Sequence, residues 1–157
     1  MSQGVTVLIA YDGSPHADAA IDQAATLFPG AQAFVATAWR SIRPAAGAAH
    51  LALPQEMIAE AIGNLDGAAE AEAIEAAAAG AVRAEAAGLR ATPLTVAAEP
   101  NTWVGLLAAA EENAADVIAV GSRGRSAVSS ALLGSVSNAL VHNADRPVLV
   151  VRAASDG

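Results

Sequence analysis

The feature that most constrains the fold is a regular alternation between short apolar, β-branched runs and longer segments with helical spacing. The apolar runs occupy residues 5–11, 33–39, 92–97, 116–120 and 147–152. Alternation of this kind predicts an α/β fold in which right-handed crossovers connect parallel strands. We therefore predict a single doubly wound domain over residues 1–157, with a five-stranded parallel sheet in the order 3-2-1-4-5 and helices on both faces.

Helix signals occupy the intervals between these runs. Ser14 is a good N-cap and Pro15 suits the first helical position, which predicts a helix that ends near Phe28. Further helices are predicted from residue 55 to Gly88, from Pro100, and over about 133–143, whereas residues 40–54 are predicted to form a flexible loop and 153–157 a loose tail.

Ligands of doubly wound proteins bind at the carboxyl ends of the strands, near the point where the strand order reverses. This rule selects three segments that follow predicted strands: residues 12–14, 40–54 and 121–133. We expect the functional site to be built mainly from these segments.

The segment after the fourth predicted strand is the most informative one, because it reads Gly-x2-Gly-x9-Gly-Ser from Gly121 to Ser135. Glycines permit positive φ and lack a Cβ atom, so that backbone N–H groups can face an anion at close range. A helix that begins near Gly134 would add free amides and the positive end of its dipole. The same segment offers hydroxyl groups and fixed positive charges, on Ser135, Ser137, Arg123 and Arg125.

With this motif the chain resembles the ATP-binding branch of the universal stress protein family. The surrounding sequence agrees, because Asp12-Gly13-Ser14 ends the first predicted strand and residues 115–122 lead into the motif. Residues 132–136 and 146–151 continue the likeness, which covers nearly the whole chain apart from residues 40–65.

The resemblance implies a role for each matching residue. Asp12 and the backbone at Ala10 would hold the adenosine part, and Ala38 would contact adenine, although family members often have histidine and valine where this chain has Thr37 and Ala38. The loop after strand four would wrap the ribose and phosphates, and the next helix would complete the phosphate site. The implied nucleotide-binding residues are Ala10, Tyr11, Asp12, Ala38, Gly121, Ser122, Arg123, Gly124, Arg125, Ser126, Ala127, Gly134, Ser135, Val136 and Ser137.

Each feature also has a purely structural explanation. Asp12-Gly13 could be only a turn, and Ser14 only a helix cap. The glycine loop could serve backbone geometry alone, and its two arginines could be solvated surface charges. The three histidines, at positions 16, 50 and 142, lack metal-ligand spacing and are expected to be surface or packing residues.

Composition argues against several function classes. Sixteen acidic residues against eight basic ones, all arginine, give a net charge of −8, so we expect no nucleic acid partner. The absence of lysine excludes a Walker loop, and the absence of cysteine excludes disulfides and cysteine-based catalysis or zinc sites. We find no signal-peptide pattern and no apolar run near the roughly 18 residues of a membrane span, and we expect a cytoplasmic protein without membrane contact.

These observations favour a nucleotide-binding regulatory protein of the stress response. ATP, with or without Mg²⁺, would act as a switch that an unknown regulatory partner reads, without fast catalysis. Three alternatives stay open: a slow ATP hydrolase in which Asp12 positions Mg²⁺ or water, a binder of AMP or cyclic AMP, and a structural homodimer with a vestigial site. The sequence does not separate ATP from AMP or cyclic AMP, because such a loop recognises phosphate and not the number of phosphates.

Two further expectations concern assembly and access. The last strand, residues 147–152, should lie at a sheet edge and is apolar, and family members commonly dimerise through this strand, so we expect a homodimer. Residues 40–54 follow strand two at the ligand edge and are expected to form a mobile cover over the nucleotide.

Overall fold

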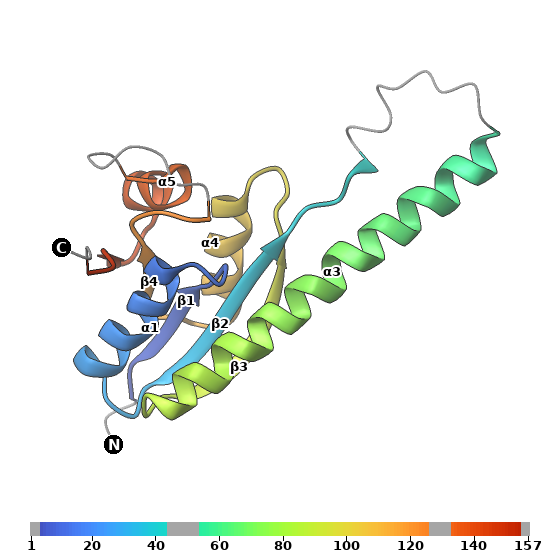
Figure 1. Cartoon of the computed structure of the whole chain (residues 1–157). Coiled ribbons are helices and arrows are strands. Elements are labelled where there is room, and N and C mark those ends of the chain that lie inside the picture. The colour runs from blue at the N-terminus through green and yellow to red at the C-terminus, as the bar shows by residue number, and fades with distance from the viewer. Residues whose placement is uncertain (1–3, 44–53, 126–132, 155–157) are drawn as a thin grey trace.

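The computed structural model describes residues 4–43, 54–125 and 133–154, and within them the predicted α/β fold is confirmed (Figure 1). Five parallel strands form one sheet in the predicted order, β3-β2-β1-β4-β5. The strands are β1 (Thr6–Ala10), β2 (Gln32–Trp39), β3 (Arg90–Ala97), β4 (Val117–Gly121) and β5 (Val148–Val151). The helices are α1 (Pro15–Leu27), α3 (Gln55–Ala86), α4 (Thr102–Glu112) and α5 (Ser135–Asn143).

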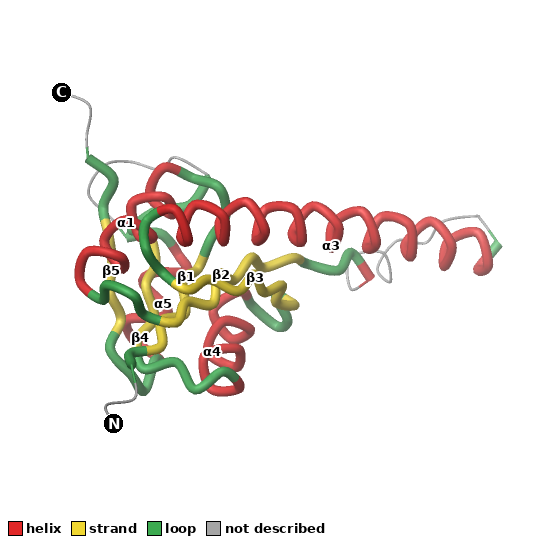
Figure 2. The backbone as a smooth tube through the Cα atoms, turned by 90° about the horizontal axis from the view of Figure 1, so that it is seen from below, coloured by secondary structure: helices red, strands yellow, loops and turns green. Residues whose placement is uncertain are grey.

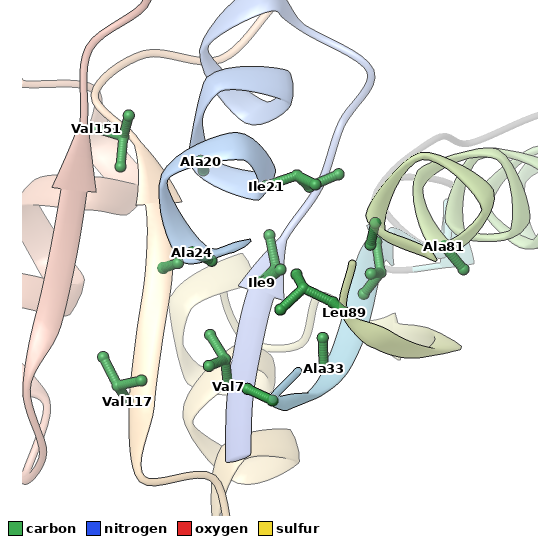
Figure 3. Packing of buried hydrophobic residues seen from close by; sticks show 14 residues of the cluster. Val7, Ile9, Ala20, Ile21, Ala24, Ala33, Ala81, Leu89, Val117 and Val151 are labelled. Atoms are coloured by element: carbon green, nitrogen blue, oxygen red, sulfur yellow. The ribbon is translucent and has the colours of Figure 1, made fainter. Parts of the chain in front are cut away.

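Helices cover both faces of the sheet, α1 and α3 on one side and α4 with α5 on the other (Figure 2). Successive residues of β1 point to opposite faces, so Ile9 packs in the cluster under α1 and α3, whereas Leu8 packs in the cluster under α4 and α5. Figure 3 shows the first cluster, in which Ile9 lies near Ile21 of α1. Burial on both faces explains why the first strand reads as an almost unbroken apolar run.

The ends of several elements differ from the prediction. The helix expected from Pro100 begins at Thr102, because Asn101 is still extended at the N-cap position. The helix expected from about residue 133 begins at Ser135, because Gly134 is extended and its N–H donates to the Ser122 carbonyl oxygen at 2.7 Å. The helix predicted to end at Gly88 ends at Ala86, and the strand ends differ by one or two residues.

The helix α3 is longer than the sheet on which it packs (Figure 1). Its C-terminal part lies on β2 and β3 through small buried residues such as Ala73 and Ala77. Its N-terminal part, residues 55–72, is largely exposed and projects past the sheet. There Asp66 accepts hydrogen bonds from the Ser41 hydroxyl at 2.6 Å and the Ile42 N–H at 2.9 Å, which tie the projecting helix to the chain that leaves β2. The same hydrogen bonds lower the pKa of the Asp66 carboxyl below its ordinary value.

Candidate functional site

A cavity of about 540 Å³ opens at the carboxyl ends of β1, β2 and β4, beside the N-terminus of α5. This is the edge of the sheet at which the sequence predicted a ligand. The predicted site residues that line the cavity are Ala10, Tyr11, Asp12, Ala38, Gly121, Arg123, Gly124, Gly134, Ser135, Val136 and Ser137.

The other four predicted residues do not line this cavity within the part of the chain that is described. Ser126 and Ala127 lie outside the described residues, as do residues 44–53 of the predicted cover. Ser122 is buried and is not among the lining residues. Arg125 lines a smaller neighbouring cavity, and its Nε donates to the Asp12 carbonyl oxygen at 2.7 Å.

The turn after β1 holds the Asp12 carboxylate at the cavity. Its Oδ1 accepts a hydrogen bond from the Ser14 N–H at 2.9 Å, and the Ser14 hydroxyl caps α1 by accepting from the Ala17 N–H at 3.1 Å. Gly13 has a φ of 78°, a conformation that residues with side chains rarely adopt. The turn and the helix cap that the sequence predicts here are therefore present, and the turn also places a carboxylate at the cavity.

None of the three glycines of the Gly-x2-Gly-x9-Gly motif has a positive φ; lack of space explains Gly121, the fit is tight at Gly134, and at Gly124 a Cβ would meet the end of the Asp12 side chain. A Cβ atom on Gly121 would lie 2.7 Å from the carbonyl carbon of His16, and one on Gly124 would lie 2.9 Å from Oδ2 of Asp12. A Cβ on Gly134, whose φ is −62°, would lie 3.3 Å from the Ser122 carbonyl oxygen. Of the two properties that the sequence analysis named, it is the missing Cβ atom and not positive φ that these glycines use. The missing Cβ atoms let the loop after β4 pack against α1 and the Asp12 turn.

The N-terminus of α5 faces the cavity without a side-chain cap. The first hydrogen bond of the helix runs from Asn138 to the Gly134 carbonyl oxygen, so the N–H groups of Ser135 and Val136 have no partner within the helix. Arg123 lines the same cavity and adds a positive charge. Free amides, the helix dipole and a guanidinium together favour a bound anion.

Ser137 differs from its predicted role as a hydroxyl donor to phosphate. Its side chain is buried, and the hydroxyl is within hydrogen-bond distance of the carbonyl oxygens of Ser122, at 3.1 Å, and Gly134, at 3.0 Å. The hydroxyl therefore ties α5 to the loop after β4 and sets the position of the free amides at the helix start.

Small and apolar side chains complete the wall of the cavity, and sequence reasoning missed most of them. Ala36 could have been found, because it lies two residues before Ala38 and shares its strand face. Thr102 and Leu106 come from α4, and no local signal in the sequence brings that helix to the site. The other missed lining residues are Ala17, Val120 and Leu133. An apolar wall beside an anion-binding helix end suits a ligand with both a planar apolar part and a phosphate.

His16 connects three segments behind the cavity. Its Nδ1 accepts a hydrogen bond from the Ala153 N–H, after β5, at 2.9 Å, and it lies 3.2 Å from the Ser122 hydroxyl, after β4. His16 itself lies in the first turn of α1. The histidine is thus a structural residue that links the cavity loop to the last strand of the sheet.

Tyr11 links the cavity to α1 and α3. Its hydroxyl donates to Asp18 of α1 at 3.1 Å, and Asp18 in turn pairs with Arg83 of α3 at 3.6 Å. The ring lies against Gly80 of α3, where a Cβ atom would come within 2.7 Å of it. Burial raises the pKa of the Tyr11 phenol, and the hydrogen bond and negative charge of Asp18 raise it further.

The described residues contain no group of three or more His, Asp or Glu side chains that could hold a metal ion. None of the described helices combines the length and hydropathy needed to cross a membrane.

Comparison with known proteins agrees with this fold. Residues 5–152 match the universal stress protein family. A universal stress protein of Thermus aquaticus, from the region 3′ of a QAH/OAS sulfhydrylase, is 35% identical over 153 residues, which covers 94% of this chain and 98% of that protein.

Two solved structures are similar over almost their whole length. The hypothetical protein MJ0577 has a TM-score of 0.76 at 18% identity, with 99% of this chain and 100% of that chain covered. A universal stress protein in complex with cAMP has a TM-score of 0.60 at 27% identity, with 98% and 100% covered.

Proposed function

The chain belongs to the universal stress protein family, and on that premise we propose that it is an ATP-binding regulatory protein without fast catalysis. One observation carries the proposal: the uncapped N-terminus of α5 and Arg123 line the same cavity as Asp12 and the small residues of β1 and β2. In the proposed complex the phosphates lie at the N–H groups of Ser135 and Val136, and the adenosine lies against Asp12 and Ala38.

The binding of ATP would act as the switch. Bound phosphate would change the state of the site, and a regulatory partner of the stress response would recognise that state. Mg²⁺ would accompany the phosphates, and Asp12, the one carboxylate among the described residues that line this cavity, is its candidate protein ligand. Because cells supply ATP in the cytoplasm, we also propose a cytoplasmic location.

A binder of cyclic AMP or AMP is the second candidate. The observation that favours it is the relative that was solved in complex with cAMP, which is 27% identical to this chain. One helix N-terminus and one lining arginine can hold a single phosphate as well as the end of a triphosphate.

Nucleotide analysis of the purified protein tests the proposal directly. Nucleotide released by acid is identified by chromatography, and calorimetric titrations with Mg-ATP, AMP and cyclic AMP then rank the ligands. ATP in near-stoichiometric amount and tightest binding of Mg-ATP would support the ATP switch, whereas preference for cyclic AMP or AMP would support the second candidate. The complete absence of binding by any of the three would contradict both. Release of phosphate from ATP at many turnovers per minute would contradict a switch without fast catalysis.

We further propose that two copies associate through β5. The strand lies at the end of the sheet order, and its side chains Val148, Leu149 and Val150 are only half-buried within one chain. An apolar edge strand with unpaired backbone groups is a ready surface for pairing with a second strand.

A further inference from the structure

The hydrogen bonds of His16 require its imidazole to be neutral. The residue is half-buried in the first turn of α1, and α1 packs on β4 and β5. Its Nδ1 accepts from the Ala153 N–H at 2.9 Å and lies 3.2 Å from the Ser122 hydroxyl oxygen. A backbone N–H can only donate, so the bond to Ala153 exists only while Nδ1 carries no proton. The ring proton of the neutral imidazole is therefore on Nε2.

A second proton on the imidazole would remove this acceptor. The Ser122 hydroxyl can rotate and accept a hydrogen bond instead of donating one, whereas the Ala153 N–H cannot reverse its role. Two N–H groups would then face each other, and the Ala153 N–H would lose its partner, which is unfavourable. Histidine is the side chain whose charge ordinarily changes between about pH 5 and 8. Mild acid is thus expected to break the link between α1 and the chain after β5.

The surroundings of His16 offer no ion pair in exchange for the lost bond. The groups that contact its Nδ1, a backbone N–H and a hydroxyl, are uncharged. The charged side chains on the segments around it are two acids and three arginines, namely Asp12, Asp18, Arg123, Arg125 and Arg152. Among the described residues, none of the ion pairs includes His16, and Asp18 is already paired with Arg83. Protonation therefore costs a hydrogen bond without a compensating salt bridge.

Ser122 connects His16 to the phosphate end of the nucleotide cavity. Its N–H donates to the Val151 carbonyl oxygen at 2.7 Å, and its own carbonyl oxygen accepts from the Gly134 N–H at 2.7 Å and from the Ser137 hydroxyl at 3.1 Å. Gly134 is the N-cap of α5, so the backbone of Ser122 sets the position of the free amides at the helix start. A shift where α1, β4 and β5 meet would move these amides.

We propose that His16 makes nucleotide binding sensitive to pH, as a positioning residue whose neutral form keeps the phosphate site in its binding geometry. The inference rests on the proposed function, because it concerns the same cavity. His16 is not among the described residues that line this cavity, so its positive charge would reach a bound phosphate only across other residues. The lost hydrogen bond acts directly on the segment that holds α5. Acid therefore weakens nucleotide binding, and by linkage nucleotide binding releases a proton from His16.

His16→Asn separates pH sensing from structure, because the asparagine oxygen accepts the Ala153 N–H at every pH and does not titrate. Calorimetric titrations with Mg-ATP at about pH 7.5 and about pH 5.5 span the ordinary histidine pKa. The comparison with His16→Asn cancels the titration of ATP itself. We expect the wild type to lose up to about tenfold more affinity in acid than His16→Asn, which corresponds to one hydrogen bond. His142→Asn is the control and should behave like the wild type, because His142 is exposed and bonds to Asn138 of its own helix.

A second measurement requires no nucleotide. In thermal melts of the ligand-free protein, the wild type should lose stability relative to His16→Asn as the pH falls, because the folded state binds this proton less readily than the unfolded chain. Hydrogen exchange at Ala153 should become faster in acid in the wild type, relative to His16→Asn at the same pH.

Equal pH profiles of Mg-ATP affinity in the wild type and His16→Asn would overturn the inference while the proposed function stands. Tighter binding by the wild type in acid would also overturn it, because the imidazolium would then act by attracting phosphate. If neither protein bound nucleotide at about pH 7.5, the proposed function itself would fall. The melts would still show whether the link from His16 to Ala153 depends on pH.

Discussion

Tyr11 lines the cavity and also contacts both α1 and α3. It is also the only tyrosine of the chain, so an ultraviolet titration of tyrosinate reports on this side chain alone. We expect a midpoint above the ordinary tyrosine pKa of about 10, because burial and Asp18 both raise the pKa of the phenol. Asp18→Asn removes the negative charge and should lower the midpoint toward the ordinary value.

The same shift has a consequence for stability. The folded-state pKa of Tyr11 lies above that of the unfolded chain. The neutral phenol therefore stabilises the fold fully below the unfolded pKa, and this stabilisation is lost as the pH rises through the folded pKa.

Asp22→Asn is the control for the titration of Asp18→Asn, because Asp22 pairs with Arg83 and has no hydrogen bond to Tyr11. An unchanged midpoint in Asp18→Asn would contradict this account of the site.

A substitution at Gly134 should lower nucleotide affinity while the protein stays folded. Gly134→Glu places a carboxylate beside the free N–H groups of α5, where like-charge repulsion with phosphate should lower nucleotide affinity by about 100-fold or more. A Cβ atom here lies 3.3 Å from the Ser122 carbonyl oxygen, so the melting temperature should fall slightly while the protein stays folded. Calorimetry with Mg-ATP beside a thermal melt makes the measurement.

Gly134→Ala is the matched control for that substitution, because it adds the Cβ atom without the charge. We expect it to reproduce the small loss of stability and to keep most of the binding. If well-folded Gly134→Glu protein bound nucleotide like the wild type, the phosphates could not lie at the start of α5.

Residues of the site differ in how far the sequence could predict them. The contiguous motif from Gly121 to Ser135 could be found, because its spacing is itself the signal. Leu106 could not be placed at the site, because only the three-dimensional approach of α4 brings it there. Ser137 lies at the cavity as expected, but its hydroxyl bonds to backbone oxygens. These partners depend on the exact path of the loop before α5, which the sequence does not reveal.

At the scale of elements, His16 connects α1 with the segments after β4 and β5. His16→Ala should lower the free energy of unfolding by about 1 kcal/mol, since it leaves the Ala153 N–H and the Ser122 hydroxyl without their acceptor. His16→Asn should recover most of this loss, because the asparagine oxygen can take the place of Nδ1. Denaturant unfolding gives the free energies, and hydrogen exchange at Ala153 shows whether the local bond has returned. Equal losses in both variants would mean that packing, and not the hydrogen bond, is what matters.

The elements themselves were largely predictable, whereas their ends were not. Strands were recognised because burial on both faces produces short apolar runs, as in residues 5–11. The start of α5 was misplaced by two residues, because Gly134 makes a long-range bond to Ser122 that no local propensity encodes. The strand order depends on the crossovers between the strands, which strand–helix alternation alone does not determine; the predicted order 3-2-1-4-5 matches the structure.

At the scale of the whole molecule, the direction of the backbone groups of β5 allows the proposed dimer to be tested cleanly. The carbonyl oxygens of Pro147 and Val151 accept hydrogen bonds from β4, so the intervening backbone groups of Val148 and Val150 point to the free edge. Val150→Pro should therefore split the dimer while the monomer keeps its fold. Light scattering at micromolar concentration gives the mass, and circular dichroism checks the fold.

Leu149→Pro is the contrasting variant, because the N–H of Leu149 points toward β4 and its loss should destabilise the monomer itself. A wild-type protein with the mass of a monomer at micromolar concentration would rule out the proposed dimer. A Val150→Pro protein that stays dimeric would place the interface elsewhere.

The overhang of α3 gives the molecule a lever arm. The helix packs on the sheet where Ala73, Ala77 and Ala84 are buried. Its exposed part, residues 55–72, extends about 27 Å beyond this packed part. A tilt of the helix by about 5° at the packed part would displace its N-terminal end by about 2 Å. Gly80, in the packed part of the helix, lies against the ring of Tyr11, which also lines the nucleotide cavity. A displacement of that ring would therefore press on α3, and the Asp66 hydrogen bonds to Ser41 and Ile42 would pass the movement of the projecting part to the chain that leaves β2.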